Sequence, residues 1–207
     1  FSSMTPQLAA ENGIAIIYQE FNNVKELSAA ENLFLGRPIR KGIIVDKKAM
    51  EEEAAKAFDQ LHIKIDPKAM MKDLTVGYQQ MVEIAKAIQQ NARILIMDEP
   101  SAPLTSAEVE SMFEVVELLR KKGVSIIYIS HRLEEIYRLS DRIVVIRDGE
   151  YIETRDIQDW TNDSLIASMV GRTLDNLFPK EFGTKGECML KVENLSIGGV
   201  LRNVSFE

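Results

Sequence analysis

The fold of this chain rests on one stretch, Ile94-Leu95-Ile96-Met97-Asp98-Glu99. Four consecutive apolar residues, followed by two acids and Pro100, are typical of a buried strand that ends at a polar edge of a sheet. Two adjacent carboxylates there can hold a Mg²⁺ ion through the first acid and polarise a water molecule with the second. The same pattern fits a strand that ends in solvated acids, so this stretch alone leaves both interpretations open.

Two further apolar runs predict strands that join the same sheet. Gly13-Ile14-Ala15-Ile16-Ile17-Tyr18 ends at Gln19, and Val124-Ser125-Ile126-Ile127-Tyr128-Ile129 ends at Ser130-His131. Helical patterns separate the runs, which implies a largely parallel sheet whose functional groups gather at the carboxyl ends of its strands. We therefore expect Gln19, the acid pair and His131 at one edge. Taken singly, Gln19 can be interpreted more plainly as an exposed amide, and His131 as an imidazole that closes a loop.

Apolar spacing predicts helices between and after these strands. One begins after Asp46, whose carboxylate can cap it, and a second begins near Val76, after the hydroxyl of Thr75. Gly77 lies where the backbone would have to approach a ligand, and a helix N-terminus can bind phosphate oxygens, although an ordinary threonine cap explains the pattern equally well. A third helix precedes Gly123, a short one ends near Leu139, and residues 143–152 form a hairpin around Asp148-Gly149.

Composition and charge exclude several classes of protein. The chain is 45% hydrophobic and 28% charged, which is typical of a globular protein. Its 207 residues allow one complete domain plus a piece, or one domain with an insertion. The 25 basic and 32 acidic residues give a net charge of −7, which argues against a duplex nucleic acid as partner. The single cysteine, Cys188, cannot form an internal disulfide. No apolar run approaches the ~20 residues of a membrane span, so we expect a soluble cytoplasmic protein.

The order of the motifs along the chain carries more information than any one of them. Gln19, Leu74-Thr75-Val76-Gly77-Tyr78, the strand ending at Asp98-Glu99, the segment 101–105 and Ile129-Ser130-His131 resemble, in sequence and spacing, the ATP-binding cassette (ABC) ATPases. The resemblance covers about the first 180 residues. Closer similarity is to the bacterial monosaccharide importers of the ribose, galactose and xylose type, and it lies in the stretches Tyr18-Gln19-Glu20, Glu31-Asn32-Leu33-Phe34-Leu35-Gly36-Arg37, Gln80-Met81-Val82-Glu83-Ile84-Ala85-Lys86-Ala87-Ile88, Tyr128-Ile129-Ser130-His131-Arg132-Leu133-Glu134-Glu135-Ile136 and Met169-Val170-Gly171-Arg172.

This resemblance implies an α/β fold of the P-loop NTPase type, the ABC ATPase nucleotide-binding domain with a helical signature subdomain, truncated at its N-terminus. It implies an ATPase that uses ATP and Mg²⁺. The implied site residues are Glu99 and His131 as catalytic groups, Gln19, Thr75, Val76 and Gly77 as nucleotide-binding residues, and Asp98 with Gln19 as metal-binding residues. Asp98 would bind the metal through water, Glu99 would orient or deprotonate the attacking water, Gln19 would sense metal and γ-phosphate, and His131 would contact the γ-phosphate.

The resemblance also implies a domain layout and partners. Residues 1–178 would form the first ABC domain, with its helical subdomain at about 20–90, 179–186 a linker, and 187–207 the start of a second ABC domain. In this family the signature acts in trans, so residues 75–77 would complete a site on the second cassette. The partners would be the permease subunits of a sugar importer, docked near residues 20–35, the second ABC domain, and indirectly a periplasmic or extracellular sugar-binding protein. The protein would lie peripherally at the cytoplasmic face of the membrane.

Three departures from the family pattern set limits on these expectations. The phosphate loop G-x-x-x-x-G-K-[ST] does not occur in the sequence, so we expect it upstream of Phe1 and expect the chain alone to be inactive. Tyr78 replaces the usual Glu or Gln of the signature, and Pro103 stiffens the segment that normally communicates between the two sites. A non-transport ABC ATPase and a regulatory cassette with an impaired site are the alternatives. The sequence does not indicate which sugar is carried.

Overall fold

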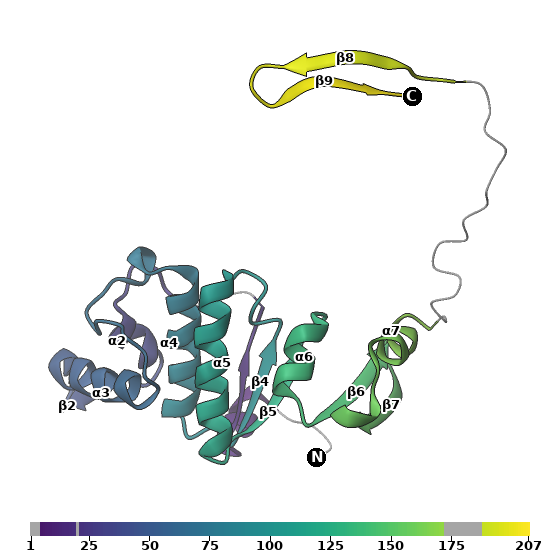
Figure 1. The fold of residues 1–207 in the computed structure, drawn as a ribbon. Coiled ribbons are helices and arrows are strands. Elements are labelled where there is room, and N and C mark those ends of the chain that lie inside the picture. The colour runs from purple at the N-terminus through teal and green to yellow at the C-terminus, as the bar shows by residue number, and fades with distance from the viewer. Residues whose placement is uncertain (1–4, 20, 172–187) are drawn as a thin grey trace. The chain divides into compact units, whose positions relative to one another are not determined.

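Three parallel strands form the centre of the larger part of the protein (Figure 1). The computed structural model describes residues 5–19, 21–171 and 188–207, and these fall into two units, Phe1–Asn162 and Asp163–Glu207. In the first unit β1 (Ile14–Ile17), β4 (Ile94–Asp98) and β5 (Ser125–Ile129) pair in the order β1-β4-β5. All three predicted strands and their parallel pairing are therefore confirmed.

Alternation along the strands separates a covered from an uncovered face of this sheet. Ile17, Leu95 and Met97 are almost completely buried, and helices α4 (Val76–Gln89) and α5 (Ser106–Lys121) lie side by side in the same core. Ile16 and Ile127 point to the other side and are about half exposed, at 42% and 51%. The two helices thus cover one face of the sheet and hold the carboxyl ends of its strands in place.

The predicted helix caps are present. The Asp46 carboxylate accepts the N–H of Ala49 at the start of α3 (Lys47–Gln60), and the Thr75 hydroxyl accepts that of Tyr78 at the start of α4. Thr105 begins α5 with a reciprocal capping box, in which the Glu108 carboxylate returns to the Thr105 N–H. Each cap satisfies N–H groups that have no partner within the helix and so fixes where the helix begins.

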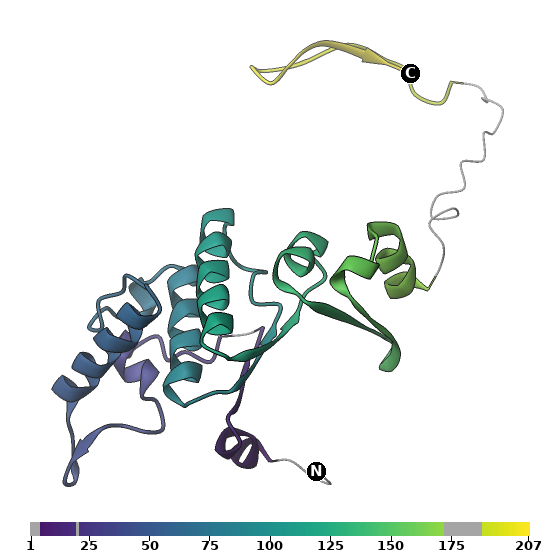
Figure 2. The same cartoon turned by 60° about the horizontal axis from the view of Figure 1, so that its bottom comes forward.

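Between β1 and β4 the chain forms a mainly helical region, drawn in blue in Figure 2. It contains α2 (Ala29–Leu33), α3, the two-residue strands β2 (Arg40–Lys41) and β3 (Ile44–Val45), a 3₁₀ turn (Met71–Asp73) and α4. Buried side chains of α2, α3 and α4 belong to one core with the sheet. The mainly helical character expected for about 20–90 agrees with this description, while its designation as a signature subdomain stays a prediction.

After β5 the first unit continues with α6 (Leu133–Leu139), the antiparallel hairpin β6 (Arg142–Arg147) and β7 (Glu150–Asp156), and a 3₁₀ turn (Ile157–Asp159). Helix α7 (Asn162–Val170) follows, and a second hairpin pairs β8 (Val192–Ile197) with β9 (Leu201–Phe206). The sequence predicted the first hairpin, but not α7, α2 or the N-terminal helix α1 (Pro6–Glu11). The predicted linker 179–186 lies outside the described residues.

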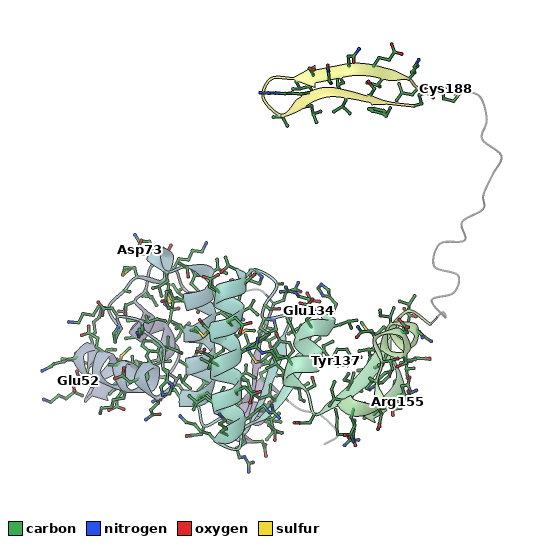
Figure 3. The ribbon with its side chains drawn as sticks, viewed as in Figure 1. Glu52, Asp73, Glu134, Tyr137, Arg155 and Cys188 are labelled. Carbon is green, nitrogen blue, oxygen red and sulfur yellow. The ribbon has the colours of Figure 1, made fainter. Side chains whose placement is uncertain are left out.

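Figure 3 locates Glu52 on the outer side of α3 and Cys188 before β8, where the thiol is free and exposed. Across the described ranges, no helix is both long enough and apolar enough to span a bilayer.

Candidate functional site

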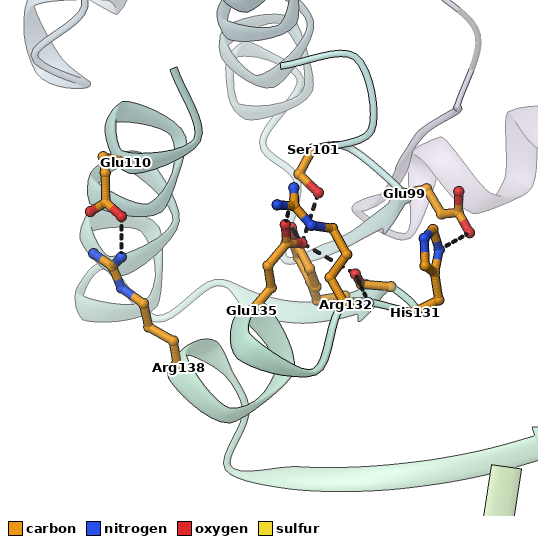
Figure 4. A network of polar contacts seen from close by, with 9 residues as sticks. Glu99, Ser101, Glu110, His131, Arg132, Glu135 and Arg138 are labelled. Atoms are coloured by element: carbon orange, nitrogen blue, oxygen red, sulfur yellow. Dashed lines mark hydrogen bonds and ion pairs between the residues drawn. The ribbon is translucent and has the colours of Figure 1, made fainter. Parts of the chain in front are cut away.

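Three of the predicted site residues meet at the carboxyl ends of the strands. The Glu99 carboxylate accepts a hydrogen bond from Gln19 Nε2 at 3.4 Å through Oε2, and its Oε1 lies 3.0 Å from His131 Nδ1 (Figure 4). Gln19 follows β1, Glu99 follows β4 and His131 follows β5. The parallel pairing brings these ends together although the residues are 80 and 32 positions apart in the sequence.

Glu99 has an unusual backbone conformation. Its φ of 44° lies in the left-handed region, and its N–H donates to the carbonyl of Ile129 at 3.0 Å. A non-glycine residue there costs on the order of 1 kcal/mol or more, so the surrounding structure has to hold it in place. The hydrogen bond across to β5 does so, and it turns the carboxylate towards His131, whose side chain is 69% exposed. The cluster is therefore open to a ligand.

Asp98 is the last residue of β4, half-buried, and lies opposite Ile129 in the register with β5. Carboxylate and amide oxygens are ligands that Mg²⁺ prefers, and Asp98, Glu99 and Gln19 provide such oxygens at one sheet edge. Within the described ranges, no group of three or more His, Cys, Asp or Glu side chains could hold a metal ion unaided. The donor set fits an ion that keeps water and substrate oxygens among its ligands, as Mg²⁺ commonly does.

Thr75 and Gly77 belong to a second, separate cluster at the start of α4. Glu108 Oε1 accepts from the Thr75 hydroxyl at 2.7 Å and from the Gly77 N–H at 3.2 Å, while Oε2 accepts from the N–H and hydroxyl of Thr105 at 3.0 and 2.9 Å. One carboxylate therefore joins the start of α4 to the start of α5. These hydrogen bonds, the one from the Thr105 backbone first, lower the pKa of Glu108 to about 2.

Gly77 makes this contact sterically possible. A Cβ atom on Gly77 would lie 2.5 Å from Glu108 Cγ, well inside van der Waals contact. The sequence predicted that the backbone at Gly77 comes close to a ligand; in the structure its close neighbour is the side chain of Glu108. Val76 is the first residue of α4, and both Val76 and Tyr78 are exposed, at 37% and 42%.

A third polar cluster surrounds the buried carboxylate of Glu135 on α6 (Figure 4). Its Oε2 accepts from the hydroxyls of Ser101, Tyr128 and Ser130 at 2.7, 2.8 and 3.2 Å. Arg132 Nη1 lies 2.8 Å from Oε1. Burial raises the pKa of the Tyr128 hydroxyl, and its hydrogen bond to Glu135 raises that pKa further.

The structure thus brings some of the predicted residues together and leaves others apart. Gln19, Glu99 and His131 share one cluster with Asp98 beside it in the chain, whereas in the described part of the chain no hydrogen bond links residues 75–77 to them. Sequence reasoning missed Glu108 and Glu135. The spacing of a threonine and a glutamate three residues later is a capping-box signal that could have identified Glu108, but no local pattern identifies Glu135.

Comparison with known sequences finds a matching family and curated relatives. The profile of the ABC transporter family matches residues 3–102. The galactose/methyl galactoside import ATP-binding protein MglA of Clostridium perfringens (strain ATCC 13124) is 44% identical over 200 residues, which cover 96% of this chain and 39% of that protein. The ribose import ATP-binding protein RbsA of C. perfringens (strain SM101) is 46% identical over 200 residues, which cover 96% and 40%. The chain spans about two fifths of the length of these curated relatives.

Solved structures show the same fold. An ATP-binding cassette of an ABC transporter superposes with a TM-score of 0.66 at 25% identity, over 79% of this chain and 69% of that one. A nucleotide-free cassette gives a TM-score of 0.64 at 24% identity, over 74% and 64%. The fold is therefore that of the ABC ATPase nucleotide-binding domain. With residues 3–102 matched by the family profile and 44% to 46% identity to these relatives along 96% of the chain, the chain belongs to the ABC transporter family, among its ATP-binding proteins.

Proposed function

We propose that this chain supplies the hydrolytic residues of an ATPase that energises the import of a monosaccharide. The observation that carries the proposal is the convergence of Gln19 and His131 on Glu99 at the carboxyl ends of three parallel strands. Such an edge is where α/β proteins bind ligands, and phosphoryl transfer needs positioned charge there more than covalent chemistry. The names of the relatives, which are ATP-binding proteins for ribose and galactose import, support the direction and class of transport.

In this proposal Glu99 orients the attacking water and accepts its proton. The carboxylate is held between an amide donor and an imidazole, so its two oxygens keep a fixed direction. His131 contacts the terminal phosphate as negative charge moves towards it, and its exposed ring leaves room for that contact. Gln19 responds to the metal and the phosphate through the amide that now donates to Glu99.

Asp98 and Gln19 are the residues that would hold Mg²⁺ beside the phosphates, where the ion would neutralise their charge. The β- and γ-phosphates also need a backbone nest and a lysine, which the phosphate loop provides in proteins of this kind. No such loop occurs in the 207 residues, so that part of the site has to come from another segment of chain.

Residues 75–77 would act on a nucleotide held by the opposite cassette. The Thr75 hydroxyl and the Gly77 N–H are the donors available to a phosphate at the start of α4, and both now donate to Glu108. A hydroxyl donates one hydrogen bond at a time, so an arriving phosphate has to take the place of the Glu108 carboxylate. Tyr78 and Pro103, the two residues that depart from the family pattern, are both exposed.

The proposed partners are the permease subunits of the importer, contacted by residues 20–35, of which Glu20 lies outside the described residues, and a second ABC domain that begins at about 187. A sugar-binding protein outside the membrane would act through the permease. The proposed location is the cytoplasmic face of the membrane, and the absence of a membrane-spanning helix among the described residues is compatible with it. The assignment of 1–178 to the first cassette belongs to the same proposal.

The test uses an extended protein, defined as this chain with a phosphate-loop segment joined before residue 1 and the remainder of the second cassette joined after residue 207. The catalytic glutamate of that second cassette is changed to Gln, so that turnover reports on the site of this chain. Glu99→Gln should lower the rate of ATP hydrolysis about 10²- to 10⁴-fold, because the amide keeps the shape but accepts no proton. Mg-ATP affinity should stay within about threefold, since the water-activating group adds little to ground-state binding.

Glu110→Gln is the matched control, because it makes the same change at an exposed carboxylate that pairs with Arg138 at 2.6 Å. It should leave both hydrolysis and affinity unchanged. Equal turnover in the Glu99→Gln and Glu110→Gln proteins would show that Glu99 does not carry the hydrolysis step.

A further inference from the structure

We propose that Glu135 is a positioning residue. It keeps the side chains of Glu99 and His131 close to each other by binding the two segments that carry them. The proposal rests on the function proposed above for that pair. Glu135 itself faces away from the open cluster and is only 4% exposed, so it acts through the segments that it binds. Figure 4 shows its carboxylate between Ser101 and Arg132, with the Glu99 and His131 pair to one side.

The segment that carries His131 is bound to Glu135 on both sides of the imidazole. The Ser130 hydroxyl donates to Glu135 Oε2 at 3.2 Å and accepts the Arg132 N–H at 3.0 Å. The Arg132 guanidinium in turn lies 2.8 Å from Glu135 Oε1. The residues before and after His131 are therefore tied to one carboxylate, which fixes the direction in which the imidazole leaves the backbone.

The segment that carries Glu99 is bound to the same carboxylate. Ser101, two residues later and 2% exposed, donates its hydroxyl to Glu135 Oε2 at 2.7 Å. The turn between them is closed, because the Ala102 N–H donates to the Glu99 carbonyl at 3.2 Å and the Leu104 N–H donates to the Ser101 carbonyl at 3.0 Å. Holding Ser101 thus holds the turn in which Glu99 keeps its left-handed backbone.

The carboxylate form of Glu135 is required for this arrangement. Three hydroxyls donate to its Oε2, and the Arg132 guanidinium pairs with its Oε1. A glutamine of the same shape either turns its NH₂ towards the hydroxyls and loses those hydrogen bonds, or turns it towards Arg132 and leaves the guanidinium charge without its partner. In either orientation part of the common anchor is lost while the side-chain volume stays the same.

The consequence for function is geometric. Glu99 Oε1 and His131 Nδ1 lie 3.0 Å apart, at the ends of two different strands. A displacement of about 1 Å in such a pair can lower the rate of a reaction about 100-fold, even when nothing touching the substrate has changed. Glu135 should therefore affect the rate of hydrolysis and leave nucleotide affinity almost unaltered.

The first experiment uses the 207-residue chain and needs no nucleotide. The chain has two histidines, His131 and the exposed His62 beyond α3, so the imidazole signals in an NMR spectrum can be assigned and His62 serves as internal reference. Glu135→Gln should shift the ring signals of His131 and leave those of His62 in place, whereas Glu110→Gln should shift neither. Unchanged His131 signals in a folded Glu135→Gln chain would overturn the proposal.

The second experiment uses the extended protein and a double-mutant cycle. Glu135→Gln should lower kcat about 10- to 100-fold with KM within about threefold. Added to His131→Ala, it should lower kcat by a clearly smaller factor than in the parent, because one of the two groups that Glu135 positions is already removed. A merely structural role predicts independent losses that multiply, and that result, or a kcat equal to that of Glu110→Gln, would overturn the proposal.

Ser130→Ala provides the same tests if Glu135→Gln does not fold. It removes the donor next to His131 and keeps the carboxylate with Arg132, Ser101 and Tyr128, so a shift of the His131 signals and a smaller loss of kcat are expected. No shift and no loss would count against Glu135 as the anchor. If instead Glu99→Gln and His131→Ala leave hydrolysis unchanged, the proposed function fails, and the NMR comparison still decides whether Glu135 positions His131.

Discussion

Glu99 is the residue that both Gln19 and His131 contact at this sheet edge. Its left-handed φ of 44° and its contacts with Gln19 and His131 place a partly exposed carboxylate where the ends of three strands meet. Strained backbone of this kind is retained when the surroundings over-determine it, and such residues cluster at functional sites. Here the surroundings are the backbone hydrogen bond to Ile129 and the turn fixed through Ser101.

At the same scale, we predict that His131→Ala in the extended protein slows ATP hydrolysis more than it weakens Mg-ATP binding. The contact of His131 matters most while the γ-phosphate is leaving, so its loss raises the barrier more than it raises the dissociation constant. A kcat lowered at least 10-fold with affinity within about threefold is expected from steady-state kinetics and calorimetry. His62→Ala, at the other histidine, is the control. A loss confined to nucleotide affinity would contradict the role given to His131.

The individual residues differ in how far the sequence could predict them. Gln19, Glu99 and His131 were predictable because each follows an apolar run, and parallel strands bring their carboxyl ends to one edge. Their contacts with one another needed the fold, since the positions in the chain lie far apart. Glu135 could not be predicted, because its four partners come from two different loops and a strand, and only tertiary packing brings them to one carboxylate.

At the scale of elements, Glu108 links the first turns of α4 and α5. The sequence predicted both helices and the Thr75 cap, because capping depends on residues only three positions apart. The link between the two helices was not predictable from such short spacing. Helix α2 was missed because it has five residues, too few for an apolar period to show.

Glu108→Gln should change how the stability of the chain depends on pH. The folded pKa of Glu108 is about 2, below its ordinary value of 4.5, so the carboxylate contributes stability above pH 4.5 that is lost as the pH falls from 4.5 towards 2. The variant should unfold with a free energy lower by roughly 1 to 2 kcal/mol at pH 7, after allowance for solvent screening of a partly exposed group. The difference from the parent should shrink across that acidic window.

Urea unfolding of the 207-residue chain at several pH values measures this. Thr75→Val removes one donor and should show part of the same loss, whereas Thr75→Ser keeps the hydroxyl and should follow the parent. A free-energy difference between Glu108→Gln and the parent that stays constant from pH 7 to pH 3 would contradict this assignment of the hydrogen bonds.

We expect Gly77→Ala to lower the stability of the chain when residue 108 is Glu and to raise it when residue 108 is Ala. In the parent chain the new Cβ would displace the Glu108 side chain, at a cost of about 1 kcal/mol in lost hydrogen bonds. In a Glu108→Ala background that clash is gone, and alanine is favoured over glycine in a helix by about 0.5 to 1 kcal/mol. Thermal and urea unfolding of the four proteins tests this, and an equal effect in both backgrounds would show that Gly77 does not serve to make room for Glu108.

At the scale of the whole molecule, the proposed function assigns this chain one part of a nucleotide site. It carries the strand-end cluster and the cluster around Thr75 and Gly77, but the sequence contains no phosphate loop. One face of the three-stranded sheet is exposed, whereas parallel sheets in α/β proteins are covered on both faces. The exposed face therefore agrees with a site that another segment of protein completes. The sequence predicted the fold class well, since three strands and their intervening helices have strong apolar periods. The domain boundaries stay predictions.

In the proposed function, Glu99 and His131 serve a nucleotide whose phosphates are held by a segment outside these 207 residues. Calorimetric titration of Mg-ATP into the chain and into the extended protein tests this division. We expect no saturable binding by the chain from the low-micromolar to the millimolar range, and saturable binding once the phosphate loop is supplied, because the loop provides the backbone N–H groups and the lysine that bind the phosphates. Tight binding of Mg-ATP by the chain alone would show that the nucleotide site has been misplaced.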